Sequence, residues 1–237
     1  MNKKKKYLVL DVETANMIED PLVYDIGFAI ADNTGKIYEA YSFVISDIFF
    51  DMADIMKTAY YAKKIPLYKE RIRNNETKVI DFLGARWFIL QLMKKYHCNT
   101  VMAYNAKFDV TALNTTLRYL TKSAKRWFFP YGTTVNCIWN MACQVLYTQK
   151  AFAKEAIKNE WYSNAKNLRT SAEIGKNYIA KTTNFEEEHT GLSDVKIEIE
   201  IFAKCVKQHK RMDRNINRMC WKIPTEYHKE FLKAAFA

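Results

Sequence analysis

Two carboxylates stand one residue apart at the end of the first apolar segment of the chain. Residues 7–14 read Tyr-Leu-Val-Leu-Asp-Val-Glu-Thr, a pattern that predicts a β-strand of the core. Residues two apart on a strand point to the same face, so Asp11 and Glu13 project together. Buried like charges repel unless a cation lies between them, and hard oxygen ligands suit Mg²⁺ or Mn²⁺. A strand that simply runs out into solvent would tolerate the same acids, so this stretch alone leaves both interpretations open.

The pattern along the chain predicts an α/β fold. Strands are expected at 7–14, 24–31, 36–45, 100–105 and near 131–135, and a hairpin turn at 32–35 makes the first three an antiparallel meander. Helices are expected at 79–95, 108–120, 138–146, within 151–179 and 186–208, and on either side of Pro224. A meander followed by alternating helices and strands gives a mixed sheet flanked by helices, of which the ribonuclease H-like architecture is one example.

Three segments carry more specific expectations. Residues 46–77 are less regular, and we expect one helix there that covers part of a cleft. The helix at 79–95 is expected to turn six apolar side chains to the core, namely Val79, Phe82, Leu83, Trp87, Leu90 and Met93. The helix within 186–208 is expected to do the same with Val195, Ile199, Phe202 and Val206.

A chain of 237 residues is long enough for one core. We expect one domain over residues 1–210, with a basic, helical extension at 211–237 packed on it. No apolar run approaches the roughly 18 residues of a membrane span, and the run behind the N-terminal lysines is too short for a signal peptide. No membrane partner is expected.

The cysteines favour a cytoplasmic location. There are five of them without a paired framework, which fits reduced thiols. Cys205 and His209 lie one helical turn apart, as zinc ligands do, but no second close pair completes a site. A buried helix position explains Cys205 equally well.

The positive charge of the chain is concentrated in two segments. The formal net charge is +11, and residues 57–95 hold ten lysines and arginines against three acids, while residues 204–233 hold nine against three. Aromatic residues are interleaved with the cations between 60 and 73, as on surfaces that bind single strands. This distribution of charge favours a binding surface for a polyanion, although a lysine-rich chain also gains solubility from such charge.

Two later segments add carboxylates and a histidine. Asp109 ends the sequence Asn-Ala-Lys-Phe-Asp after the fourth predicted strand, and Asp194 stands five residues after His189 at the start of a predicted helix. Each acid has an ordinary explanation by itself. Asp109 could complement the dipole of its helix, and Ser193 or Asp194 could cap the next one.

In chain order, these residues resemble the histidine-type DEDD exonucleases (DEDDh), a DnaQ-like family of the ribonuclease H-like superfamily. The resemblance covers about residues 7–206 and rests on three motifs, Asp11-Val12-Glu13-Thr14, Asn105 with Phe108-Asp109, and His189 with Asp194. Asp25-Ile26-Gly27 in the second strand adds an acid-Ile-Gly match. The tyrosine-type subgroup has Tyr four residues before its last Asp, where this chain has Thr190.

The chain departs from the family pattern at two places. Ala15-Asn16 replaces the common Thr-Gly after the first motif, and Gly191 replaces the common Ala two residues after the histidine. Both changes leave the ligands intact.

The resemblance implies a metal-dependent 3′→5′ exonuclease that releases nucleoside 5′-monophosphates, with two Mg²⁺ or Mn²⁺ ions per site. Asp11 would bridge both ions, Glu13 and Asp194 would hold the ion nearer the attacking water, and Asp109 would hold the other. His189 would take the proton from that water. By family analogy, the backbone of Val12 or Thr14, together with Asn105 and Phe108, would contact the terminal nucleotide, although a Phe in this position more often serves packing.

The expected partner is a nucleic acid with a free 3′ end, single-stranded or frayed. The sequence leaves open DNA or RNA, single or double strands, the oligomeric state, and a role in repair or replication as against degradation or trimming. Proofreading would need a separate polymerase. The alternative function is a non-catalytic nucleic-acid-binding subunit of the same fold that acts through a partner.

Overall fold

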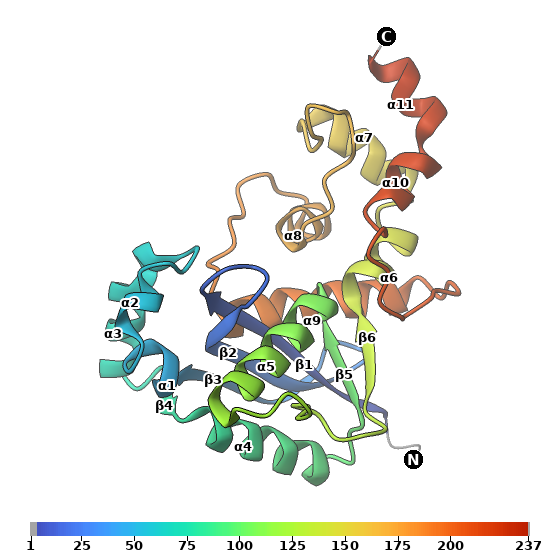
Figure 1. Ribbon diagram of the computed structural model, residues 1–237. Coiled ribbons are helices and arrows are strands. Elements are labelled where there is room, and N and C mark those ends of the chain that lie inside the picture. Colours follow the sequence, from blue (N-terminus) through green and yellow to red (C-terminus); the bar gives the residue numbers. More distant parts are fainter. Residues whose placement is uncertain (1–3, 237) are drawn as a thin grey trace.

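The computed structural model describes residues 4–236, which form a mixed six-stranded sheet with helices on both faces (Figure 1). The strand order is β4-β3-β2-β1-β5-β6. β1 pairs antiparallel with β2 and β2 with β3, whereas the β3–β4, β1–β5 and β5–β6 pairs are parallel. The strands are β1 (Lys6–Ala15), β2 (Leu22–Asp32), β3 (Ile37–Ile45), β4 (Lys78–Ile80), β5 (Thr100–Ala103) and β6 (Thr134–Cys137). The predicted meander and mixed α/β sheet are confirmed.

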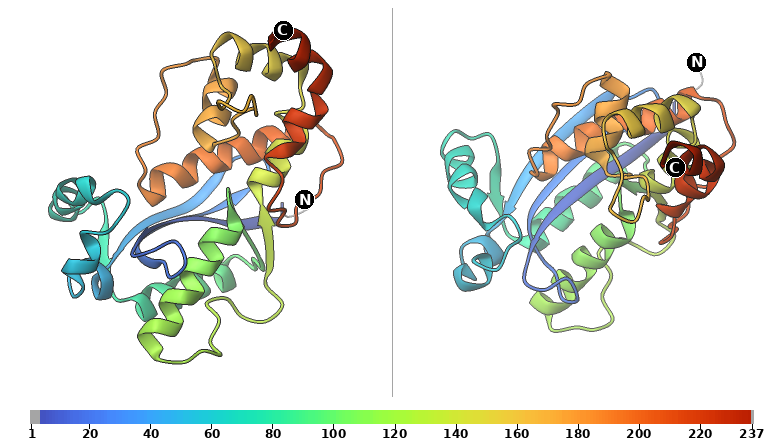
Figure 2. Two further views of the ribbon diagram at one scale, coloured as in Figure 1. Left: turned by 45° about the horizontal axis from the view of Figure 1, so that its top comes forward. Right: turned by 90° about the horizontal axis from the view of Figure 1, so that it is seen from above.

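Helices form a layer on each face of the sheet. α9 covers one face with α6 and α8 packed beside it, and α4 and α5 cover the other (Figure 2). The helices are α1 (Ser46–Phe49), α2 (Ala53–Met56), α3 (Ile65–Arg73), α4 (Phe82–Lys95), α5 (Ala106–Thr121), α6 (Ile138–Val145), α7 (Lys150–Lys158), α8 (Ala172–Ala180), α9 (Gly191–Lys207), α10 (Lys222–Tyr227) and α11 (Lys229–Phe236), with a 3₁₀ turn at Ala62–Lys64.

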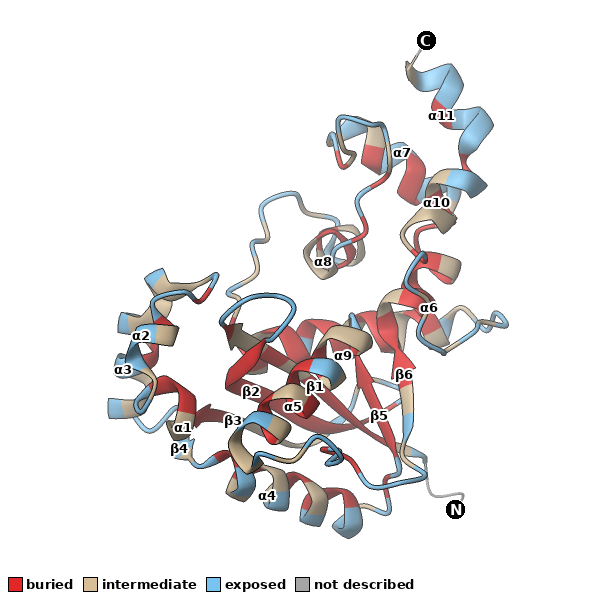
Figure 3. Ribbon diagram, viewed as in Figure 1, coloured by how far each residue is buried: buried red, intermediate tan, exposed pale blue. Residues whose placement is uncertain are grey.

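The alternation of side chains along β1 decides where its two carboxylates point. Leu8 and Leu10 enter the core on the α4–α5 side, whereas Tyr7 and Val9 enter the core on the α9 side. Asp11 and Glu13 continue the second set, because they are separated from Val9 by two and four residues. The sheet is buried throughout its centre (Figure 3), so both acids leave the strand into the interior beneath α9.

Backbone rather than side chains separates β2 from the start of α9. The face of β2 toward α9 carries the small residues Gly27, Ala29 and Ala31. A Cβ added to Gly27 would lie 1.9 Å from the carbonyl carbon of Gly191, and a Cβ on Gly191 would lie 2.4 Å from the amide nitrogen of Gly27. The two glycines therefore let the first turn of α9 touch the sheet directly, and this contact explains why the chain has Gly at 191.

The predicted helix at 79–95 is wrong at its beginning. Residues 78–80 form β4, an edge strand beside β3, and the helix starts after Asp81, whose side chain accepts the Gly84 N–H at 2.8 Å. Of the six expected core residues, Phe82 and Met93 are buried, Leu90 is half-buried, and Val79, Leu83 and Trp87 are exposed. The helix instead buries a stripe with a strict helical period, which consists of Phe82, Ala85, Ile89, Leu92 and Met93.

Two further expectations are corrected. Residues 46–77 hold three short helices and a 3₁₀ turn instead of one helix. Pro224 does not divide two helices, because it lies in the first turn of α10, where its missing N–H has no helical partner to lose. The predicted stripe of α9 is confirmed, with Val195, Ile199 and Phe202 buried and Val206 half-buried.

The chain ends in two helices, α10 and α11, of which α10 packs against α6. The division of the chain at residue 210 stays a prediction, and its ends, residues 1–3 and 237, lie outside the described residues. All five cysteines are buried free thiols. Among residues 4–236, no helix is both long and apolar enough to cross a membrane.

The close contact between β2 and α9 makes Gly27→Ala strongly destabilising. The added methyl group must push α9 away from the sheet, which we expect to cost at least about 2 kcal/mol in the free energy of unfolding. Urea unfolding followed by circular dichroism measures the change. The control is Gly84→Ala, whose Cβ meets side chains and no backbone, namely the Asp81 carboxylate at 2.8 Å and Ile80 Cγ1 at 3.1 Å, and it should stay within about 1 kcal/mol of wild type. Equal stability of both variants would contradict this packing.

Candidate active site

All five residues predicted to act in catalysis line one cleft of about 450 Å³. They come from β1, from the first turn of α5, from the segment that leads into α9 and from the first turn of α9 itself. The residues are Asp11, Glu13, Asp109, His189 and Asp194. Of the predicted substrate contacts, Val12, Asn105 and Phe108 also line the cleft, and Thr14 is not among its lining residues. Segments that are 100 and 180 residues apart in the chain are therefore neighbours in space.

Asp109 reaches the cleft because α5 begins directly after β5. The last paired residue of β1 toward β5 is Val9, so the strand beyond it has a free edge on that side. The Asp109 side chain bonds to this free edge, because its Oδ1 accepts the N–H of Val12 at 3.3 Å. The side chain is only 3% exposed. This bond fixes Asp109 beside Asp11 and leaves the Val12 N–H engaged within the protein.

Asp25 fixes the start of α9 and thereby the position of Asp194. It lies directly opposite Glu13 in the β1–β2 register. Its Oδ2 accepts the Gly191 N–H at 2.9 Å and the Tyr68 hydroxyl at 2.7 Å. Burial raises the pKa of Asp25 to about 6, although these hydrogen bonds act in the opposite direction. The acid-Ile-Gly motif is thus a structural junction between strand and helix.

The imidazole of His189 is held from two sides. Its ring stacks on Tyr61, with centroids 4.4 Å apart and planes inclined by 15°. Its Nδ1 lies 3.7 Å from Oε2 of Glu187, and the residue has a left-handed backbone with φ of 50°. Burial lowers the pKa of His189, and the charges of Lys64 and Lys63 add to this effect. A neutral imidazole at neutral pH is the form that can accept a proton.

A basic segment from the insertion between β3 and β4 is tied to the loop that carries His189. Lys64 donates to the carbonyl oxygen of Glu188, and Arg71 forms an ion pair with the Glu188 carboxylate. Arg71 also donates to the hydroxyl of Thr190 at 2.9 Å. Residues 61–71 therefore hold the loop that carries His189, but no residue of the segment 46–77 is among the lining residues of the cleft, so its expected role as a cover of the cleft stays a prediction.

The carboxylates of the cleft resist ionisation. Burial and then the neighbouring acids Asp109, Glu198, Glu13 and Asp194 raise the pKa of Asp11 well above its ordinary value. Burial is also the main cause that raises the pKa of Glu13 to about 9 and those of Asp109 and Asp194 to about 7. So many buried acids can be ionised together only beside compensating positive charge.

The donor atoms of the cleft fit a hard divalent cation. Ligand atoms of Glu13, His189 and Asp194 all lie within 4.8 Å of one another, as do those of Glu173, Glu187 and His189. Two carboxylate oxygens that line the cleft, Oε1 of Glu187 and Oε2 of Glu198, are buried without a hydrogen-bond partner. Carboxylate oxygens are the ligands that Mg²⁺ and Mn²⁺ prefer, and a bound ion would satisfy such oxygens.

The sequence interpretation missed two acids of the cleft. Glu198 stands four residues after Asp194, so both occupy one face of α9, and this spacing could have indicated it. Glu187 lies two residues before His189 in an irregular loop, where no periodicity reveals a direction. The other lining residues not foreseen are Tyr104, Trp139, Thr170, Ser171 and Ala172.

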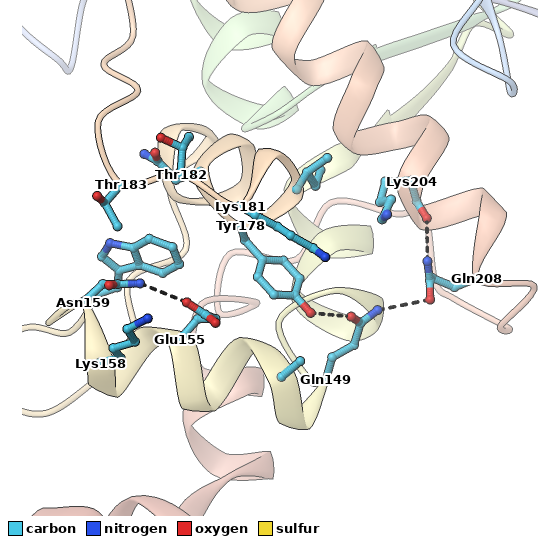
Figure 4. Close-up of a pocket in the computed structure, with 14 residues that line it drawn as sticks. Gln149, Glu155, Lys158, Asn159, Tyr178, Lys181, Thr182, Thr183, Lys204 and Gln208 are labelled. Atoms are coloured by element: carbon cyan, nitrogen blue, oxygen red, sulfur yellow. Dashed lines mark hydrogen bonds between the residues drawn. The ribbon is translucent and has the colours of Figure 1, made fainter.

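A larger cavity of about 810 Å³ lies between α7, α8 and the end of α9 (Figure 4). Its wall contains a chain of hydrogen bonds from the Tyr178 hydroxyl to Gln149 at 2.6 Å and from Gln149 to Gln208 at 3.1 Å. Its lining has one carboxylate, Glu155, and three lysines, so it lacks the donor set of a metal site. None of the predicted site residues lines it.

Comparison with known proteins shows the fold. No family model and no curated protein matches the chain. Among solved structures, it is similar to the zinc-bound complex of E. coli exonuclease I with single-stranded DNA, with a TM-score of 0.51 and 13% identity over 88% of this chain and 41% of that one. The E. coli exonuclease I complex with a 5cy-dT13 oligonucleotide gives the same values. Apo exonuclease I gives a TM-score of 0.51 and 12% identity over 86% and 42%.

These similarities confirm the ribonuclease H-like fold class. The chain spans about two fifths of the length of the exonuclease I structures that it matches.

The raised pKa values predict that stabilisation by Mg²⁺ grows with pH. The acids of the cleft titrate higher in the folded than in the unfolded chain, with Glu13 near 9 and Asp194 near 7. They therefore stabilise the metal-free protein at low pH, and this contribution is lost as pH rises from about 4 toward about 9. Mg²⁺ competes with the protons, so its thermal shift should be at least about twofold larger at about pH 8 than at about pH 5.5. Differential scanning fluorimetry measures this shift, and a shift independent of pH would contradict the electrostatic description.

Proposed function

We propose that the chain is a metal-dependent 3′→5′ exonuclease of the DEDDh type that releases nucleoside 5′-monophosphates. The observation that carries this proposal is the convergence of four acids and a histidine from three distant segments in one buried cleft. The fold supports it, because the similar exonuclease I structures include complexes with single-stranded DNA. The basic segment of residues 61–71, which holds the loop with His189, supports a polyanionic substrate.

Each residue of the cleft has a distinct part in this proposal. Asp11, Glu13, Asp109 and Asp194 would hold two divalent ions, Mg²⁺ or Mn²⁺, and the chemistry that these ions would supply is positive charge to stabilise the charge that develops on the phosphate and its leaving oxygen. His189 accepts the proton of the attacking water at its Nε2, since its Nδ1 faces Glu187. The ring of Tyr61 keeps the imidazole in one plane by stacking.

The terminal nucleotide would lie between the carboxylates and the start of α5. Asn105 and Phe108 line the cleft there, and Trp139 lines it from α6. Aromatic faces bind bases of any sequence by stacking, which suits an enzyme that removes one nucleotide after another. Lys63 is exposed beside this site and can pair with a backbone phosphate of the incoming strand.

Histidine substitution separates catalysis from fold. Loss of the general base in His189→Ala should lower kcat about 10²–10⁴-fold. Asp194→Asn removes a proposed metal ligand and should abolish the stepwise shortening of the substrate. The measurement is a denaturing-gel time course with Mn²⁺ on 5′-labelled single-stranded DNA and RNA. His97→Ala, an exposed position after α4, is the matched control and should cut like wild type.

A ladder that shortens from the 3′ end in wild type, and is lost in Asp194→Asn, supports the exonuclease and reveals the preferred sugar. Intact DNA and RNA with salt-sensitive binding retained would refute it in favour of the non-catalytic binding subunit.

Replacement of Lys64 should move the pH dependence of activity. Lys64 adds to the effect of burial that lowers the pKa of His189, and it opposes the burial that raises the pKa values of Glu13 and Asp194. Lys64→Met therefore raises all three pKa values, and the acid limb of the kcat/KM profile should shift to higher pH. Lys69→Met, an exposed change on α3, should leave the limb in place. A shift to lower pH in Lys64→Met would exclude this electrostatic role.

A further inference from the structure

Glu198 is a carboxylate of the cleft that no motif of the sequence accounts for. It lies on α9 one helical turn beyond Asp194, so its side chain leaves the helix on the same face. It lines the cleft together with Asp11 and Asp109, and it is only 2% exposed. A glutamate in such a position is uncommon, because glutamates are almost never fully buried unless paired.

No positive group of the described chain pairs with Glu198. Its Oε2 is buried without any hydrogen-bond partner, and no ion pair in residues 4–236 includes it. Of the carboxylates that line the cleft, only Glu187 shares this feature, with a buried Oε1 that has no hydrogen-bond partner.

The position of Glu198 in the fold joins it to the predicted ligands. Asp194 lies one helical turn before it on α9, and Asp11 and Asp109 line the same cleft from β1 and α5. The buried Oε2 of Glu198 therefore belongs to the same group of carboxylates as the predicted ligands.

We propose that Glu198 is a fifth carboxylate ligand of the divalent-ion site in this cleft, through its unpartnered Oε2. This assignment rests on the proposed function only in taking the cleft as a metal site. It gives the buried oxygen its missing partner. It also adds a protein ligand to the four acids that the motifs supply, so the site would bind divalent ions more tightly than those four acids allow.

The test is Mn²⁺ binding to the metal-free full chain by isothermal titration calorimetry. Glu198→Gln keeps the size of the side chain and removes its charge, and it should weaken one Mn²⁺ binding step at least about tenfold. Glu200→Gln is the matched control on the same helix, because Glu200 pairs with Lys176 outside the cleft lining, and it should bind Mn²⁺ like wild type. Glu198→Asp keeps a carboxylate and should bind Mn²⁺ more tightly than Glu198→Gln.

Thermal unfolding of the metal-free variants separates a ligand from a structural residue. If Glu198 is a metal ligand, metal-free Glu198→Gln should unfold within about 4 °C of wild type, and its stabilisation by Mn²⁺ should be reduced. Wild-type Mn²⁺ affinity in Glu198→Gln, or equal affinity in Glu198→Asp and Glu198→Gln, would overturn the assignment.

The outcome also stays distinct from that of the proposed function. Strand cleavage by wild type with unchanged Mn²⁺ binding in Glu198→Gln refutes the ligand and leaves the exonuclease. If Glu198→Gln weakens Mn²⁺ binding but wild type cleaves neither DNA nor RNA, the ligand assignment stands and the exonuclease proposal is refuted.

Discussion

The repulsion among buried carboxylates is the constraint on which this structure depends. Asp11 and Glu13 point from the central strand of the sheet into the interior, where Asp109, Asp194 and Glu198 join them. Such a group of acids opposes folding when ionised, and Lys64 is the cation whose charge acts on both Glu13 and Asp194. The fold tolerates the cluster when the acids bind protons, and the proposed divalent ions would compensate the same charges. Stability and the proposed catalysis therefore depend on the same oxygens.

Precise placement of the acids requires α9 to touch the sheet. Gly27 and Gly191 allow backbone contact, and Asp25 locks that contact by accepting the Gly191 N–H. Asp194 follows Gly191 by about one helical turn, and Glu198 follows Asp194 by another. The basic segment of residues 61–71 holds the loop with His189 through Lys64 and Arg71. The contacts that fix the start of α9 on β2, and those that hold the loop with His189, are thus made by residues outside the predicted catalytic set.

The sequence predicted those parts whose signals are local. The alternation of side chains along a strand predicted that Asp11 and Glu13 share one face, and the helical period predicted the buried apolar stripe of α9. β4 escaped prediction because three residues at a sheet edge carry no periodic signal, and Val79 was assigned to the following helix instead. Glu187 and Tyr61 were missed because their roles depend on how two irregular loops meet around His189. Thr14, expected near the substrate, follows a shift in the β1–β2 register and is not among the lining residues.

The most direct test of the account is a crystal structure of the chain grown with Mn²⁺ and a nucleoside 5′-monophosphate, with anomalous diffraction data. The account predicts two anomalous peaks in the cleft, both in contact with Asp11, with the phosphate of the product beside them and His189 facing it. A cleft that contains no anomalous peak under saturating Mn²⁺ would contradict the claim that these carboxylates form a metal centre.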